Sequence, residues 1–166
     1  MSLPASHPFS HDQSILRFPV IVQGKTYHID LVADSYIDSE NITAEFSKQP
    51  ALLAWFGVIY QQANNSYETA KTELEIFEAK ACNEARQCVE EKVKVTETFI
   101  KQLVMADEEY ISRRQRVDAL KAQAELTRRA FEAIREKGSV LISLGAHIRS
   151  EIEQMGREYI RHRGGV

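Results

Sequence analysis

Cysteine, proline, glycine and aromatic residues are all scarce in this chain of 166 residues. It has two cysteines, four prolines and seven glycines, and 8% of its residues are aromatic. Two cysteines cannot build the disulfide framework on which small secreted domains depend. Little glycine and proline, with frequent alanine, glutamate, glutamine, lysine and arginine, favours long helices over a sandwich or barrel. The 43% of hydrophobic residues is enough for a packed core, which excludes a wholly disordered chain.

Long apolar runs are missing too. No stretch of about 18 apolar residues occurs, so we expect no membrane span. The first 14 residues are polar and contain histidine, proline and aspartate where a secretory signal needs an apolar stretch. We therefore expect residues 1–14 to form a flexible leader and the protein to be cytoplasmic.

Signatures of catalysis and of metal binding are also absent. The chain contains none of the common phosphate-loop, dinucleotide-binding, zinc-protease or serine-hydrolase motifs. Two of the five histidines, His7 and His11, have helical spacing but lie in the proline-containing leader, where no helix is expected. We interpret Cys82 and Cys88 as small hydrophobic residues of a helix. We predict a protein that is not an enzyme and has neither a cofactor nor a bound metal.

Two β-prone segments near the N-terminus predict a β-hairpin. Residues 17–22 and 26–32 are rich in β-branched and aromatic side chains, and the glycine-bearing residues 23–25 between them are typical of a turn. An isolated hairpin is only marginally stable, so this one must pack on another element. We expect residues 15–48 to hold the hairpin and a connector.

From Pro50 onward the apolar residues follow a helical period. In the connector before it, Asp38 or Ser39 can cap a short helix that ends at Phe46. Pro50 suits the first turn of a helix, where its missing N–H costs nothing. Apolar residues then recur at alternating steps of four and three as far as Cys88, with Glu84 as the one exception, which is the pattern of a coiled coil.

The apolar pattern slips after Cys88. One helix continuing far beyond this point would be improbably long for a globular chain, so we place a chain reversal between Cys88 and Thr96. Thr96 can cap a short helix over about 96–105. Asp107, which two glutamates follow, is the expected cap of the last helix.

A second apolar seam, meaning a row of apolar side chains along one helix face, runs from Phe99 to Tyr159. Gly138 and Gly145 are points where its helix can bend. We predict a mainly α fold in which residues 49–166 form an antiparallel, coiled-coil-like hairpin of long helices. One such hairpin cannot cover its whole seam, so we expect the protein to form a homo-oligomer. The expected oligomerisation residues are Val117, Leu120, Phe131, Ile134, Leu141, Ile148 and Ile152.

Charge is unevenly distributed within a net charge of −3. Residues 1–110 carry 9 basic and 17 acidic side chains, whereas residues 111–166 carry 12 and 7. Steps of seven along one flank of the second seam give six positions, of which all but Ile142 are basic. We call the five basic residues the basic stripe: Arg114, Lys121, Arg128, Arg135 and Arg149. Further positive charge comes from Arg129, Lys137, Arg157, Arg161 and Arg163. Such a stripe can hold a phosphate backbone, or it can form ion pairs with glutamates of the first long helix, and periodicity leaves both open.

Several segments resemble a known family. They are residues 49–56 (QPALLAWF), residues 94–97 (KVTE) leading to 107–110 (DEEY), and residues 130–138 (AFEAIREKG) leading to 141–149 (LISLGAHIR). In order and spacing they resemble the UvsY-type recombination mediators of tailed phages, over roughly residues 40–150.

The resemblance implies an oligomeric, helical protein that binds single-stranded DNA in recombination and repair and has no enzymatic activity. Such a mediator helps a RecA-like recombinase replace single-strand-binding protein, in the cytoplasm of an infected cell or prophage host. The family's basic cluster late in the first long helix corresponds here to Lys80 and Arg86, and its self-associating helices correspond to about 117–160. We expect DNA binding by Lys80 and Arg86 together with the basic stripe. The alternative is a structural or adaptor protein that binds no nucleic acid.

Overall fold

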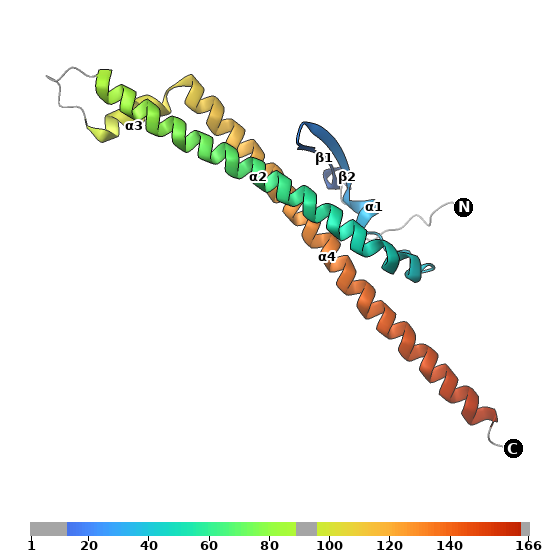
Figure 1. Ribbon diagram of the computed structural model, residues 1–166. Coiled ribbons are helices and arrows are strands. Elements are labelled where there is room, and N and C mark those ends of the chain that lie inside the picture. The colour runs from blue at the N-terminus through green and yellow to red at the C-terminus, as the bar shows by residue number, and fades with distance from the viewer. Residues whose placement is uncertain (1–12, 89–95, 164–166) are drawn as a thin grey trace. The chain divides into compact units, whose positions relative to one another are not determined.

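The computed structural model describes residues 13–88 and 96–163. Its elements are η1 (Gln13–Leu16, a 3-10 turn), β1 (Arg17–Val22), β2 (Lys25–Asp30), α1 (Leu31–Ser35), α2 (Ile42–Cys88), α3 (Glu97–Met105) and α4 (Glu108–Arg163) (Figure 1). The predicted mainly α fold, with an N-terminal β-hairpin followed by long helices that pack against each other, is confirmed. The predicted leader up to residue 12, and most of the predicted reversal, at residues 89–95, lie outside the described residues.

The chain divides into two compact units. The hairpin unit comprises residues 1–54 and 132–166, and so contains both strands, α1, the start of α2 and the C-terminal part of α4. The three-helix unit comprises residues 55–131, with the rest of α2, all of α3 and the start of α4.

The β-hairpin forms around the turn that the sequence indicates. β1 and β2 pair antiparallel, with Arg17 opposite Asp30. Gln23 and Gly24 both have positive φ, at 50° and 74°, and a two-residue turn of this kind matches the right-handed twist of the strands. The buried side chains of the hairpin are Val20, Val22 and Ile29.

The second strand is shorter than expected because a helix cap interrupts it. We predicted a strand over residues 26–32, but β2 ends at Asp30. The Asp30 side chain accepts a hydrogen bond from the backbone N–H of Ala33 at 3.1 Å, which satisfies a donor of the first turn of α1. The backbone therefore turns into α1 two residues before the expected strand end.

The first long helix begins eight residues before its predicted start. The carbonyl of Asn41 accepts hydrogen bonds from the N–H groups of Ala44 and Glu45, which opens α2 at Ile42 and places Pro50 inside the helix. The expectation of a separate short helix capped by Asp38 or Ser39 is wrong. Asp38 instead accepts a hydrogen bond from the backbone N–H of Glu40, in a turn that precedes the helix.

The core of the three-helix unit draws on all three helices. Thr96 and Asp107 cap α3 and α4 as predicted, since each side chain accepts a hydrogen bond from an N–H of the first turn that follows. The expected seam is displaced in α3, because Phe99 and Leu103 are exposed. The buried cluster consists of Ala70, Leu74, Cys82, Ile100, Val104, Tyr110 and Val117.

Two glycines of α4 allow close contacts with the start of α2. A Cβ at Gly138 would lie 3.1 Å from Nε2 of Gln49, and a Cβ at Gly145 would lie 3.0 Å from the ring of Phe46. α4 is helical through both positions. Without a side chain at 138, the Gln49 amide reaches the carbonyl of Ile134 and donates a hydrogen bond of 2.6 Å.

Candidate nucleic-acid and self-association surfaces

Of the predicted DNA-binding residues near the end of α2, one is exposed and the other is paired. Lys80 is exposed. Arg86 donates two hydrogen bonds to Glu97 of α3, at 3.0 and 2.7 Å, and a third to Asn83. The hydrogen bond from Arg86 holds the pKa of Glu97 below its ordinary value. This pair joins α2 to α3.

Two arginines of the basic stripe also contact carboxylates of their own helix. Arg114 lies 3.5 Å from Asp118, and Arg128 lies 2.9 Å from Glu125. The hydrogen bond from Arg128 lowers the pKa of Glu125. Exposed pairs of this spacing contribute little to stability. They nevertheless reduce the positive charge that these positions offer to a ligand.

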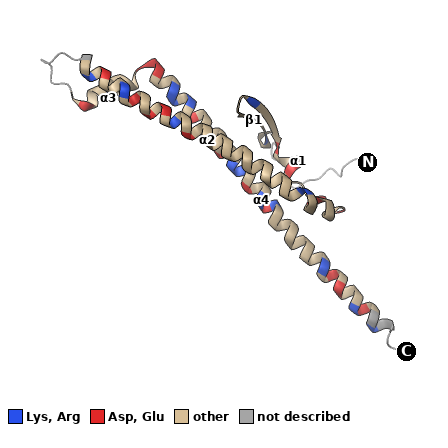
Figure 2. Cartoon of the chain, viewed as in Figure 1, with Lys and Arg blue, Asp and Glu red and all other residues tan. Residues whose placement is uncertain are grey.

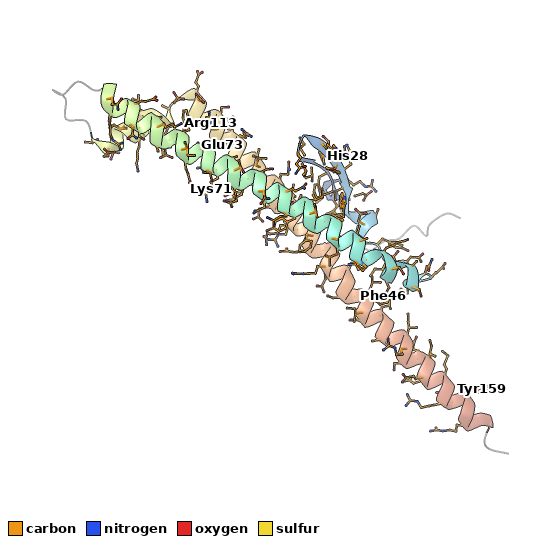
Figure 3. All side chains as sticks on the ribbon, viewed as in Figure 1. His28, Phe46, Lys71, Glu73, Arg113 and Tyr159 are labelled. Carbon is orange, nitrogen blue, oxygen red and sulfur yellow. The ribbon has the colours of Figure 1, made fainter. Side chains whose placement is uncertain are left out.

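A groove between α2 and α4 in the three-helix unit brings in a lysine that our sequence analysis missed. Lys71 of α2, which is labelled in Figure 3, lines the groove together with Arg114 and Lys121 of the basic stripe. Its volume is about 250 Å³, and its other lining residues are Tyr67, Leu74, Glu75, Glu78, Val117 and Asp118. Lys71 directly follows Ala70 of the first apolar seam, and that flanking position is the sequence signal that could have identified it.

In the hairpin unit, the basic stripe continues with two exposed arginines. Neither Arg135 nor Arg149 has an acidic partner in the described part of the chain, and both are exposed. Residues 138–148 of the same helix carry no Lys, Arg, Asp or Glu, and both basic and acidic residues occur beyond them (Figure 2).

Lys137 is not the surface charge that we expected. Its side chain is 7% exposed, and its ammonium group lies 2.7 Å from a carboxylate oxygen of Glu45 at the start of α2. The same group donates a hydrogen bond of 3.1 Å to the backbone carbonyl of Asp34 in α1. Burial raises the pKa of the Asp34 carboxyl, with Asp30 adding to the shift and Lys137 opposing it. Lys137 therefore connects three helices of the hairpin unit and is not available to a ligand.

Most of the expected oligomerisation residues are covered by the chain itself. Val117 belongs to the buried cluster of the three-helix unit, and Ile134 and Leu141 are fully buried. Leu120, Phe131 and Ile148 are half-buried. These side chains are used within one copy, which leaves Ile152 as the exposed member of the set.

The uncovered part of the seam lies beyond the start of α2. Phe46, four residues into α2, lies against Gly145. Only about one turn of α2 precedes Phe46, so α2 can cover little of α4 beyond Gly145. Past this point, Ile152, Met155 and Tyr159 are 60%, 60% and 61% exposed. Figure 3 shows Tyr159 near the C-terminal end of α4. We call Ile148, Ile152, Met155 and Tyr159 the C-terminal seam. It combines apolar character with exposure, which is the usual mark of an interaction surface.

Other kinds of site find no counterpart in the described residues. No group of three or more His, Cys, Asp or Glu side chains in residues 13–88 and 96–163 is placed to hold a metal ion. None of the helices within these residues is both long and apolar enough to cross a membrane. Comparison with protein-family models, curated proteins and solved structures found no match to this chain.

Proposed function

We propose that this protein is a self-associating, non-catalytic, single-stranded-DNA-binding protein of the recombination-mediator kind, acting with a RecA-like recombinase and single-strand-binding protein. The observation that carries the proposal is the uncovered end of α4. There an exposed apolar seam, at Ile152 and Met155, lies beside Arg149, an arginine without an acidic partner in the described part of the chain. Copies that join through such a seam repeat the arginine, and a repeated cation suits a phosphate backbone.

The chemistry of the exposed cations supports binding to a backbone rather than to particular bases. Lys121, Arg135 and Arg149 lie on α4. From a helix surface, their long side chains can reach phosphate oxygens without forming hydrogen bonds to the edges of the bases. We therefore expect binding that depends steeply on salt and only weakly on sequence.

The test measures fluorescence anisotropy of a labelled single-stranded oligonucleotide at low and moderate salt. The double substitution Arg135→Glu and Arg149→Glu should weaken binding by at least roughly tenfold at low salt, because it removes two phosphate contacts and adds two repulsions. A matched control is Lys25→Glu with Lys101→Glu, which changes net charge equally at exposed positions outside α4. Absence of binding by the folded wild-type protein at low salt, or equal loss in both double variants, would refute DNA binding by α4.

A structural or adaptor protein is the second candidate, and the ion pairs favour it. Arg86, Arg114 and Arg128 each contact a carboxylate of the same chain. In this function the cations only build the helical assembly. It predicts self-association by light scattering, no anisotropy change with any oligonucleotide, and a loss of oligomer stability when the paired arginines are reversed in charge.

A further inference from the structure

The two edges of the β-hairpin differ in how well they can pair with a further strand. Val22 and Lys25 flank a two-residue turn, so they form a hydrogen-bonded pair, and such pairs alternate with non-hydrogen-bonded pairs along the ladder. Pro19 and His28 therefore form a non-hydrogen-bonded pair, and their backbone groups point away from the hairpin. Because proline has no N–H, the edge of β1 lacks a donor that another strand would need.

The edge of β2 has no such interruption. Thr26 lies opposite Ile21 and, like His28, has its N–H and C=O on the outer side of the strand. Both residues are exposed, and no hydrogen bond within residues 13–88 and 96–163 satisfies these outward backbone groups. We call the backbone of Thr26 and His28 the open edge. Unpaired donors and acceptors on an exposed strand are a template for another extended chain.

The charge around the open edge is positive. Residues 13–29 contain Arg17, Lys25 and His28 and no aspartate or glutamate. Asp30, which follows, is already engaged, because it lies 2.9 Å from Arg17 and caps α1. Arg17 and His28 line a hollow of about 300 Å³ on the hairpin, together with Phe18, Pro19, Ile29 and Asp30 (Figure 3). A guanidinium has several N–H donors, so Arg17 can bind a further carboxylate in this hollow.

These features disfavour a second copy of the hairpin and a DNA strand as occupants of the open edge. A second copy brings the same basic side chains and no carboxylate besides Asp30, which is already engaged. A DNA backbone offers acceptors but no donors, so it would leave the C=O groups of Thr26 and His28 unpaired. A peptide backbone offers both, and acidic side chains supply the charge that the hairpin lacks.

We propose that the open edge binds an extended, acidic peptide segment of another protein, which adds a third strand to the hairpin beside β2. Backbone hydrogen bonds to Thr26 and His28 hold the segment, and its carboxylates meet the basic side chains of the hairpin. This interaction goes beyond the proposed function and is separate from DNA binding by α4. The hairpin also lies outside residues 40–150, over which the family resemblance extends.

The test titrates the full chain into a fluorescein-labelled octapeptide of alternating glutamate and valine and follows fluorescence anisotropy. We expect saturable binding with a dissociation constant below about 1 mM. An octapeptide of alternating lysine and valine should not bind, because its charge repels the basic hairpin. The acidic octapeptide with every backbone nitrogen methylated should not bind either, because it has no N–H to donate.

Amide-proton exchange locates the bound peptide on the wild-type protein. With saturating acidic peptide, exchange at Thr26 and His28 should slow, because their N–H groups gain acceptors. The N–H groups of Tyr27 and Ile29 already pair with β1, so their exchange should change little.

A charge reversal beside the open edge tests the choice of an acidic segment. Lys25→Glu should weaken binding of the acidic peptide about fivefold. The matched control Lys101→Glu changes the net charge equally at an exposed position of α3 and should bind the peptide as the wild type does. Circular dichroism verifies that both variants are folded.

Several outcomes overturn the proposal. They are the absence of saturable binding, equal binding of the acidic and basic peptides, undiminished binding of the methylated peptide, and slowed exchange at other residues only. Slowed exchange at Thr26 and His28 with an oligonucleotide, or with rising protein concentration alone, would assign the open edge to nucleic acid or to a second copy. DNA binding by α4 is decided separately, by the variants Arg135→Glu and Arg149→Glu.

Discussion

Lys137 shows how a single residue can join elements that are distant in the sequence. Its buried ammonium group is satisfied by the Glu45 carboxylate and by the carbonyl of Asp34. Taking both charges out of water is costly, and the short contact compensates only while both partners are present. Removing one partner should therefore cost more than removing the pair.

Replacing Lys137 with methionine tests this expectation. The substitution leaves the Glu45 side chain, which is 12% exposed, without its cation, and should lower the free energy of unfolding by about 2–4 kcal/mol. The double variant Lys137→Met with Glu45→Leu should recover most of that loss. Urea unfolding of the wild type, both single variants and the double variant measures the coupling. A double variant less stable than Lys137→Met would contradict this account.

The Asp34 carboxyl gives a second prediction, which concerns pH. Its pKa is raised, chiefly by burial, so ionisation of Asp34 is less favourable in the folded state than in the unfolded state. That cost is present at neutral pH and disappears as the pH falls below the ordinary pKa of the carboxyl, where both states are protonated. Asp34→Asn should therefore raise the free energy of unfolding at pH 7 and lose this advantage near pH 3. A stabilisation that persists undiminished in acid would argue against it.

At the scale of the element, α3 shows where sequence patterns stop being decisive. Phe99, Ile100, Leu103 and Val104 are all apolar, so the periodicity of this short helix permits either of two adjacent faces to be buried. The structure buries Ile100 and Val104. The choice depends on packing against α2 and α4, which no local pattern encodes.

A pair of alanine substitutions distinguishes the two faces of α3. Ile100→Ala should cost about 2–4 kcal/mol, because it leaves a cavity in the buried cluster. Leu103→Ala, on the exposed face, should change stability by less than about 0.5 kcal/mol. Thermal or urea unfolding compares them, and a larger cost at Leu103 would mean that the seam runs as the periodicity suggested.

Features that depend on neighbouring residues were predicted well from the sequence. Contacts between residues that are distant in the sequence were not predicted. The hairpin turn and the caps at Thr96 and Asp107 depend on neighbouring residues, and all three appear as expected. The start of α2 at Ile42 was missed because proline is typical of the first turn of a helix, and Pro50 was therefore taken to mark the start. The partners of Lys137 and Arg86 were missed because nothing in the sequence states which distant carboxylate will lie near a given cation.

At the scale of the whole molecule, the exposed C-terminal seam should determine both the number of copies in the assembly and the affinity for DNA. The double substitution Ile152→Asp and Tyr159→Asp places charges in the C-terminal seam, so we expect light scattering to give the mass of one chain. The affinity for single-stranded DNA should fall with it, since linked copies bind one strand more tightly than separate copies.

The matched control for this prediction is Ile76→Asp, at an exposed position of α2 in the three-helix unit. It should alter neither mass nor affinity. Arg135→Glu with Arg149→Glu should lower affinity while leaving the mass unchanged, which separates the two contributions. A seam variant that keeps the wild-type mass would show that the copies meet elsewhere.

The absence of described chain against the last turns of α4 has a consequence for amide-proton exchange. In an isolated copy, the side chains of residues 152–159 are exposed, and the exposed end of a helix opens readily. Deuterium uptake there should be rapid in dilute protein and slow as the concentration rises. Uptake by the core around Ile134 should not depend on concentration. The core therefore serves as the internal reference for the uptake of residues 152–159 in the same measurement.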